Sequence, residues 1–221
     1  MINRRRRRAP LASLVALAAL VLGACSAAPA GTTGPSADFS GTTGPSADQY
    51  GTNCPTSQPP ALGAGETRTV ALATSLGTIT LKISADLSPI AAGNFVALAS
   101  CGYYDGVVFH RVVPGFVIQG GDPTGTGRGG PGYTIQDEPV TTTYHRGTLA
   151  MARTPAANSQ GSQFFIVLDD GAAGSLANAN TYAIFGEVSA GMDTVDAIAA
   201  AADAELPSQP IAMTKVTVTN P

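Results

Sequence analysis

The chain has 221 residues, of which 44% are hydrophobic and 12% charged, and it contains 26 glycines and 16 prolines. That length allows one domain of ordinary size with a tail but is short for two full domains, and so many helix-breaking residues exclude a long helical bundle. The formal net charge is −3, and five of the twelve Lys and Arg residues lie among the first eight residues.

The amino terminus has the pattern of an export signal. Arg4 to Arg8 form a basic block, and Ala9 to Leu22 form an apolar run that is short for a membrane span. The residues Leu22-Gly23-Ala24-Cys25 resemble the bacterial lipobox, in which the cysteine sulfur receives diacylglycerol before cleavage. We therefore expect residues 1–24 to be a lipoprotein signal peptide and Cys25 to be lipidated. An ordinary secretory signal or an uncleaved anchor is the alternative.

This assignment predicts a location and excludes one class of partner. A lipid on Cys25 holds the protein at the outer face of the cytoplasmic membrane, or at the outer membrane in a cell that has two. The sequence leaves open this choice and the choice between Sec and twin-arginine export. Removal of residues 1–24 leaves seven Lys and Arg against fifteen Asp and Glu, a net charge of −8. An acidic mature chain argues against nucleic acid as a partner.

Residues 25–66 contain almost no apolar periodicity. The eight residues Gly31 to Asp38 recur unchanged as Gly41 to Asp48. Two such polar copies are too few to build a solenoid, so we expect a flexible low-complexity tether that is followed by one domain over residues 67–221.

With Cys25 assigned to the lipid, Cys54 and Cys101 remain as an even pair outside the reducing cytosol. We expect them to form a disulfide that ties the end of the tether to the domain. Two independent thiols, with Cys101 in the core, are the alternative, because the sequence does not supply the required geometry.

The domain begins with two alternating segments. Apolar and polar residues alternate in Thr69–Leu72 and Thr78–Ile83, on either side of Ser75-Leu76-Gly77, which predicts a β-hairpin. Ser88 and Pro89 then have the pattern of a helix start, and the apolar positions that follow predict a short amphipathic helix that ends at Gly102.

The rest of the chain alternates between short strand candidates and turn residues. Gly191–Ala202 predicts a second helix. The predicted order of elements is a hairpin, a helix, several strands, a second helix and a last strand. This order fits a closed or nearly closed antiparallel barrel whose open ends are covered by the two helices. The remaining strand candidates are Val107–Val112, Phe116–Gln119, Thr148–Ala152, Gln163–Leu168, Tyr182–Val188 and Ile211–Thr219.

Two segments combine polar and aromatic residues in a way that suggests a binding site. Phe109 to Asp122, with the sequence FHRVVPGFVIQGGD, places Arg111, Phe116 and Gln119 within nine residues. The second segment is GSQFFIV, residues 161–167. If it is a strand, the period of two puts Gln163 and Phe165 on one face and Phe164 and Ile166 on the other.

These segments resemble the cyclophilin family at every specified position of its signature Phe-His-Arg-x-x-Pro-Gly-Phe-x-x-Gln-Gly-Gly-Asp. Further matches extend the resemblance over about residues 68 to 219. The resemblance implies a mainly β fold, a closed eight-stranded antiparallel barrel capped by two α-helices, and peptidyl-prolyl cis/trans isomerase activity. The further matches are Asn94-Phe95, Tyr104-Asp105-Gly106, Met151-Ala152-Arg153, Gly161 to Phe165 and Phe185-Gly186.

The resemblance also implies a role for individual residues. Arg111 matches the catalytic arginine, and Gln119 and Gln163 match polar residues that hold the substrate backbone and the arginine. Ala152 and Arg153 match the segment that pairs with the substrate main chain, where the family often has Asn in place of Arg153. The expected walls of the proline pocket are Phe116, Met151 and Phe165.

Two departures from the family pattern concern the same pocket. The chain has no tryptophan, so the indole that contacts cyclosporin in many members is missing, and Leu176 is its approximate neighbour. We therefore expect weak cyclosporin binding. Tyr182 stands where the family has a pocket histidine, and it keeps an aromatic ring with a polar tip.

Prolyl isomerisation breaks amide resonance and no covalent bond, against a barrier of about 18–20 kcal/mol. It needs no nucleophile, metal or other cofactor. Arg111 is suited to donate to the proline nitrogen, which regains a lone pair only in the twisted transition state. We expect a monomeric enzyme that acts on proline-containing segments of unfolded or exported proteins. A binding module or holdase that grips such segments without catalysis, or a structural envelope role, remains the alternative.

Overall fold

The first two alternating segments form the long hairpin that the sequence predicts. The structure is a computed structural model that describes residues 53–220, and the expected signal peptide, Cys25 and most of the tether lie outside the described residues. β1 (Thr67–Thr74) and β2 (Gly77–Ser84) pair antiparallel along their whole length. Every second side chain faces the interior, and the fully buried ones are Val70, Leu72, Ile79, Leu81 and Ile83.

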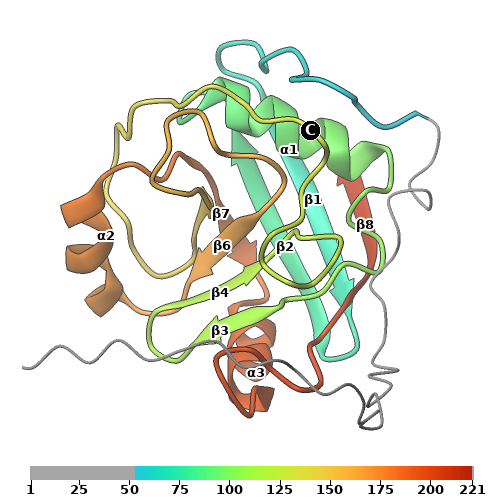
Figure 1. Ribbon diagram of the computed structural model, residues 1–221, viewed down its shortest axis with the longest axis vertical. Coiled ribbons are helices and arrows are strands. Elements are labelled where there is room, and N and C mark those ends of the chain that lie inside the picture. Colours follow the sequence, from blue (N-terminus) through green and yellow to red (C-terminus); the bar gives the residue numbers. More distant parts are fainter. Residues whose placement is uncertain (1–52, 221) are drawn as a thin grey trace, which may run out of the picture. The chain divides into compact units, whose positions relative to one another are not determined.

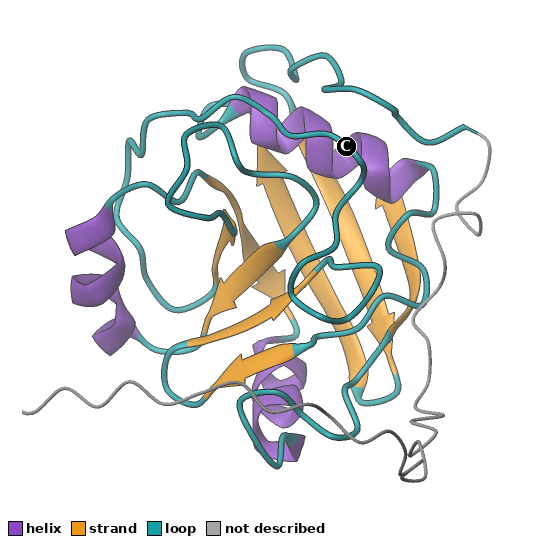
Figure 2. Ribbon diagram, in the orientation of Figure 1, coloured by secondary structure: helices purple, strands orange, loops and turns teal. Residues whose placement is uncertain are grey.

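Six further strands complete an eight-stranded sheet (Figures 1 and 2). The order across the sheet is β3-β4-β6-β5-β7-β2-β1-β8, and all neighbours are antiparallel. This confirms the prediction of a mainly β fold built on eight antiparallel strands. The six strands are β3 (Arg111–Val113), β4 (Val117–Gly120), β5 (Thr148–Met151), β6 (Phe164–Val167), β7 (Ile184–Ala190) and β8 (Met213–Thr219).

The sheet curls so that the regions of its two outer strands, β3 and β8, meet at a seam. Val108 bridges to both Asp122 and Ala212, and the Phe109 N–H donates to the Ile211 carbonyl at 2.9 Å. The barrel is therefore closed by isolated bridges rather than by a continuous ladder. The predicted strand 107–112 is regular only from Arg111 onward, because the residues before it form this seam.

The two predicted helices cover opposite ends of the curled sheet (Figure 1). α1 (Pro89–Ser100) packs against β8, β7, β1 and β2, and α3 (Met192–Ala201) packs against β2 and β4. None of the helices between residues 53 and 220 has the length and hydropathy needed to cross a membrane.

A third helix, α2 (Ala173–Ala179), follows a 3₁₀ turn over Asp170–Ala172 and was not predicted. Its seven residues are too few to show a helical period, and it has no side-chain cap at its start. It ends at Asn180, which adopts the left-handed conformation with φ 43° that this residue type tolerates.

Apolar side chains gather on both faces of the strands β4 to β7. On β6, Phe164 and Ile166 face the barrel interior while Phe165 and Val167 face outward, as the period of two predicts. The inner cluster includes Phe95, Phe109, Leu149, Met151, Phe164 and Phe185. The outer cluster consists of Val117, Tyr144, Ala150, Phe165, Val167, Ala172, Leu176 and Ile184, with Phe116, Ala152 and Tyr182 among the partly exposed residues that pack against it.

The last residues of the expected tether lie on α1. A disulfide joins Cys54 to Cys101 at the C-terminal end of this helix, and the Leu62 N–H donates to the Pro89 carbonyl at 3.0 Å. A Cβ on Gly93 would lie only 2.4 Å from the Pro60 carbonyl oxygen, so the segment passes close to the helix backbone at that point. The packed part of the chain therefore begins before Thr67.

Removal of this disulfide should destabilise the domain, because the bond closes a loop over a sequence separation of 47 residues. A Cys54→Ala/Cys101→Ala variant should lose about 2–4 kcal/mol in the free energy of unfolding, measured by urea denaturation. A reductant should lower the stability of the wild type and leave the variant unchanged. Coinciding unfolding midpoints for oxidised wild type and variant would show that the bond contributes no stability.

Candidate active site

The strand register brings one cation, one amide and one aromatic ring into a single row. Arg111 on β3 lies opposite Gln119 on β4, Gln119 lies opposite Phe165 on β6, and Phe165 lies opposite Ala150 on β5. Directly opposed residues of antiparallel strands point to the same face. Because neighbouring strands are about 4.8 Å apart, the backbones of Arg111 and Phe165 lie about 10 Å apart on the outer face of the sheet.

The two glutamines of the site are fixed by each other. Gln119 Nε2 donates to Gln163 Oε1 at 2.9 Å, and Gln163 Nε2 donates to the Gly129 carbonyl at 2.9 Å. Both amides therefore have a defined orientation at the edge of the row. Within residues 53–220 these hydrogen bonds run between the two glutamines and to Gly129 rather than to Arg111, and their expected role in holding the arginine stays a prediction.

Arg111 is held instead by an acidic residue that the sequence did not single out. Its Nε donates to Glu205 Oε1 at 2.7 Å, with side chains 34% and 59% exposed. Glu205 lies between α3 and β8, 94 residues further along the chain, and it belongs to no motif. Only the fold brings it to the arginine.

Phe165 of the row and two further aromatic residues that pack in the same cluster, Phe116 and Tyr182, are together called the aromatic slot below. The edge of one ring meets the face of the other in the pair Phe165–Tyr182, with centroids 5.4 Å apart and an interplanar angle of 85°. The Tyr182 carbonyl accepts from the Tyr144 hydroxyl at 2.9 Å, and Phe116 lies at the turn between β3 and β4. Phe116 and Tyr182 are partly exposed, so these two residues reach the surface, whereas Phe165 is buried.

Met151 does not lie where the resemblance implies. Met151 is 0% exposed in the inner cluster, because it follows Leu149 by two residues on β5 and points into the barrel, so its expected role as a pocket wall is corrected. Leu176 is 3% exposed and supports the outer cluster from α2. Val117, which no sequence motif singles out as a site residue, belongs to the outer cluster together with Phe165.

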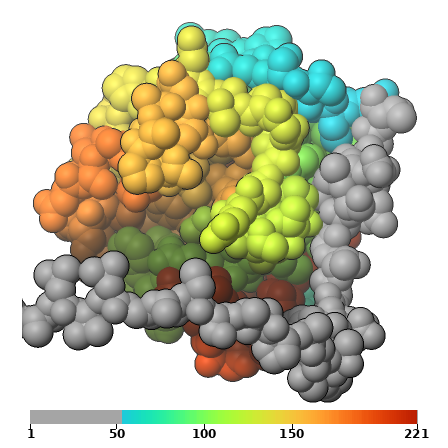
Figure 3. Space-filling model, viewed as in Figure 1, coloured from blue at the N-terminus to red at the C-terminus, as the bar shows by residue number. Residues whose placement is uncertain are grey.

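A cleft of ≈ 420 Å³ lies beside the row and is bordered by Gln119 and Gln163. The segments 127–134 and 152–163 provide its other walls, and Figure 3 shows the surface hollowed between the yellow-green and amber segments. The first of these segments is shaped by Asp122, whose Oδ1 accepts from the Thr124 N–H at 2.7 Å and from its hydroxyl at 2.8 Å. A Cβ on Gly129 would collide with this carboxylate.

The same contacts determine the charge of Asp122. Burial by itself raises the pKa of this carboxyl, but hydrogen bonds from Thr124 and from the backbone of Gly129 outweigh it and hold the pKa below its ordinary value. The carboxylate stays ionised at neutral pH. It therefore holds in place the loop whose Gly129 carbonyl accepts a hydrogen bond from Gln163.

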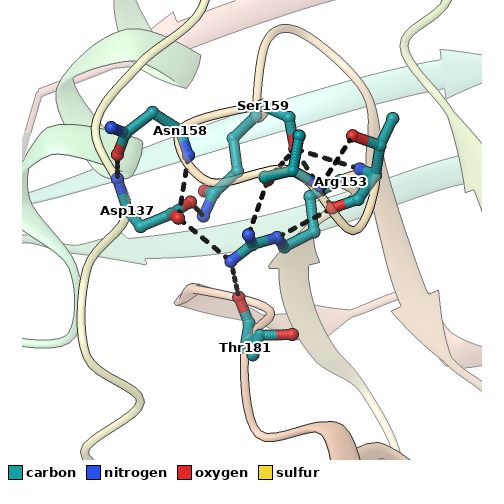
Figure 4. Close-up of polar contacts among 8 residues, drawn as sticks. Asp137, Arg153, Asn158, Ser159 and Thr181 are labelled. Carbon is teal, nitrogen blue, oxygen red and sulfur yellow. Dashed lines mark hydrogen bonds and ion pairs between the residues drawn. The ribbon is translucent and has the colours of Figure 1, made fainter.

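Arg153 joins three segments around the cleft (Figure 4). Its Nη1 lies 3.1 Å from Asp137 Oδ2, with side chains 10% and 27% exposed. Its Nη2 donates to the Ala156 carbonyl at 2.7 Å, and its Nη1 to the Thr181 carbonyl at 3.3 Å. The guanidinium is thus turned into the protein, and it holds the residue that precedes Tyr182 of the aromatic slot.

No group of three or more His, Cys, Asp or Glu side chains able to hold a metal ion occurs within residues 53–220. The arrangement offers a guanidinium, two oriented amides and an aromatic cluster of which Phe116 and Tyr182 are partly exposed. These groups are able to bind an extended peptide and to donate hydrogen bonds to it.

Comparisons with known proteins point to one family. A family model described as "Cyclophilin type peptidyl-prolyl cis-trans isomerase/CLD" matches residues 69–218. Peptidyl-prolyl cis-trans isomerase-like 3 of Dictyostelium discoideum is 40% identical over 67% of this chain and 94% of its own length. The crystal structure of a cyclophilin type peptidyl-prolyl cis-trans isomerase of Cryptosporidium parvum matches with a TM-score of 0.63 and 34% identity, and the match covers 70% of this chain and 99% of that one.

Other relatives are matched over less of their length. Peptidyl-prolyl isomerase CWC27 of Cryptococcus neoformans is 47% identical over 54% of this chain, which spans 24% of that protein. Peptidyl-prolyl cis-trans isomerase ppi1 of Schizosaccharomyces pombe is 51% identical over 45% of this chain and 66% of its own length.

Replacement of Arg153 tests the contacts around the cleft. Arg153→Met leaves the Asp137 carboxylate without its cation and removes the donors to the carbonyls, so it should lower the free energy of unfolding by about 2–4 kcal/mol. Arg128→Met is the matched control: it removes an exposed arginine of the same cleft and should change this free energy by less than about 0.5 kcal/mol. Equal urea midpoints for the two variants would show that Arg153 does not hold these segments together.

Proposed function

The chain belongs to the cyclophilin-type peptidyl-prolyl cis-trans isomerase family, and we propose that it accelerates the interconversion of Xaa-Pro bonds, with Arg111 as its catalytic group. The observation that carries this proposal is the row of Arg111, Gln119 and Phe165 on one face of the sheet. It puts a hydrogen-bond donor and an apolar slot on the same side of the molecule, where a single prolyl bond meets both.

The chemistry follows from the electronic change at the proline nitrogen. In the planar amide the lone pair is delocalised, and rotation against a barrier of about 18–20 kcal/mol localises it on the nitrogen. An N–H of the guanidinium then gains an acceptor that the planar forms lack. A bond that forms only at the half-rotated geometry lowers the barrier without tightening the ground state.

The aromatic slot and the amides have separate tasks in this reaction. Phe116, Phe165 and Tyr182 receive the proline ring and exclude water from one side of the amide. Gln119 and Gln163, fixed at 2.9 Å from each other, hold the peptide backbone, so that rotation is confined to one bond. A similar isomerase, from Cryptosporidium parvum, has a crystal structure in the presence of the dipeptide Ala-Pro, which supports a proline-containing peptide as substrate.

Cyclosporin should bind weakly. The chain has no tryptophan, and Leu176 is almost fully buried on α2, so its side chain does not replace a missing indole at the surface.

The client proteins in this proposal are exported proteins that fold outside the cytoplasm. The basic block, the apolar run and the small residues before Cys25 support a lipid anchor at the outer face of the membrane. The disulfide between Cys54 and Cys101 also supports this location, since such bonds persist in oxidising compartments. In this setting, a monomeric isomerase tethered to the membrane meets proline-containing segments as they emerge from export.

Arg111→Ala should abolish most of the activity while the domain stays folded. Loss of one donor aimed at a transition state costs about a hundredfold in rate, and we expect that loss in kcat/KM, measured in a refolding assay limited by proline isomerisation. Arg68→Ala, which removes an arginine from β1, should leave the rate unchanged. Equal acceleration by wild type and Arg111→Ala would reject the catalytic role.

Exchange NMR on an Ala-Pro peptide separates catalysis from binding alone. Wild type should broaden the peptide signals through faster cis/trans exchange. Shift changes without faster exchange would instead identify a non-catalytic binding module or holdase.

Cys25→Ser tests the proposed anchor. The variant should lose labelling by a radioactive fatty acid and its processing at residue 25, since serine does not provide the sulfur to which the lipid is attached. Membrane fractionation of cells should then show the mature form only for the wild type. Identical labelling of both proteins would rule out lipidation at Cys25.

A further inference from the structure

An acidic side chain contacts the proposed catalytic guanidinium from outside the row. Glu205 Oε1 lies 2.7 Å from Arg111 Nε, whereas Gln119 and Gln163 are bonded to each other. Glu205 lies in the connection between α3 and β8, so the contact joins two distant parts of the chain.

We propose that Glu205 is a positioning residue that holds the guanidinium of Arg111 in the orientation needed at the twisted prolyl bond. This inference rests on the proposed function, because it assigns Glu205 a role in the same reaction. Glu205 acts through Arg111 and does not itself contact the substrate.

The backbone fixes the carboxylate independently of the ion pair. The Val112 N–H, next to Arg111 on β3, donates to the Glu205 carbonyl at 2.8 Å. The connection is also braced internally, because the Asp203 carboxylate accepts from the Ser208 N–H at 2.9 Å and from its hydroxyl at 2.6 Å. Glu205 is therefore held beside β3 at two points, one on its main chain and one on its side chain.

The contact with Glu205 uses only part of the hydrogen-bonding capacity of Arg111. A guanidinium has five N–H donors, and Glu205 occupies the one on Nε. The four donors on the two Nη atoms remain for the substrate. Because the side chain of Arg111 is 34% exposed and lies on a strand of three residues, it has rotamer freedom to lose at each turnover unless a partner fixes it.

This role predicts a particular kinetic signature. The proline nitrogen accepts a hydrogen bond only when the amide is twisted, so a poorly oriented guanidinium affects the transition state more than the bound ground state. Loss of Glu205 should therefore lower kcat and leave KM almost unchanged.

The test compares Glu205→Ala and Glu205→Gln with wild type in the full-length protein. Glu205→Ala should lower kcat by about two- to fivefold, the size expected for loss of an exposed ion pair. Glu205→Gln keeps an acceptor oxygen at the same place and should restore at least half of the loss. Glu187→Gln, which removes an exposed acid of β7, controls for the change in net charge and should have no effect.

Two further measurements separate positioning from a structural role. In an Arg111→Ala background, Glu205→Ala should cause no additional loss, since the residue acts only through the arginine. The NMR signal of the Arg111 Nε–H should exchange faster with water in Glu205→Ala than in wild type.

The outcomes distinguish this inference from the function on which it rests. An inactive wild type would reject the isomerase proposal and the role of Glu205 with it. An active wild type whose kcat and Nε–H exchange are unchanged in Glu205→Ala would reject only the positioning role. Additive losses in the Arg111→Ala background would reject it as well, because they identify an effect on the fold.

Discussion

The pairing register of β3, β4, β6 and β5 is the constraint on which the rest of the site depends. Side chains of a strand alternate between faces, so a slip of one residue would turn Arg111 away from Phe165. The register is fixed by burial on both faces of the sheet: Phe164 and Ile166 fill the inner cluster while Phe165 and Val167 fill the outer one. The same packing that stabilises the barrel therefore sets Arg111, Gln119 and Phe165 on one face of the sheet.

Irregular segments around this row provide further polar contacts that orient the residues of the site. The segment 127–134 provides the carbonyl that orients Gln163, and Arg153 ties Asp137 to the residue before Tyr182. Both rely on polar contacts between segments far apart in sequence. The site thus combines a regular sheet with loops that are held by partly buried charged groups. This arrangement limits the motion of the cleft walls.

The features that could be predicted from the sequence are those that depend on local patterns. The hairpin β1–β2, the two long helices and the opposite faces of Phe164 and Phe165 all follow from periodicity, and the structure has them. The same rule applied to β5 puts Met151 on the inner face beside Leu149, where the structure has it, whereas the family resemblance implies a place in the proline pocket. α2 was too short for any period to be visible.

Contacts between distant residues were beyond the reach of sequence patterns. The bridge between Val108 and Ala212 and the ion pair between Arg111 and Glu205 join residues about a hundred positions apart, and nothing in either local segment indicates its partner. The pairing of Cys54 with Cys101 was expected only because two cysteines were left after Cys25 was assigned to the lipid. The geometry that makes the bond is a property of the fold.

The most direct test of this account is a crystal structure of the protein with a bound Ala-Pro peptide. The account predicts that the proline ring lies among Phe116, Phe165 and Tyr182, with an Nη atom of Arg111 within hydrogen-bond reach of the prolyl nitrogen. A ring bound elsewhere, or a guanidinium directed away from it, would contradict the proposal that these groups act together on one bond.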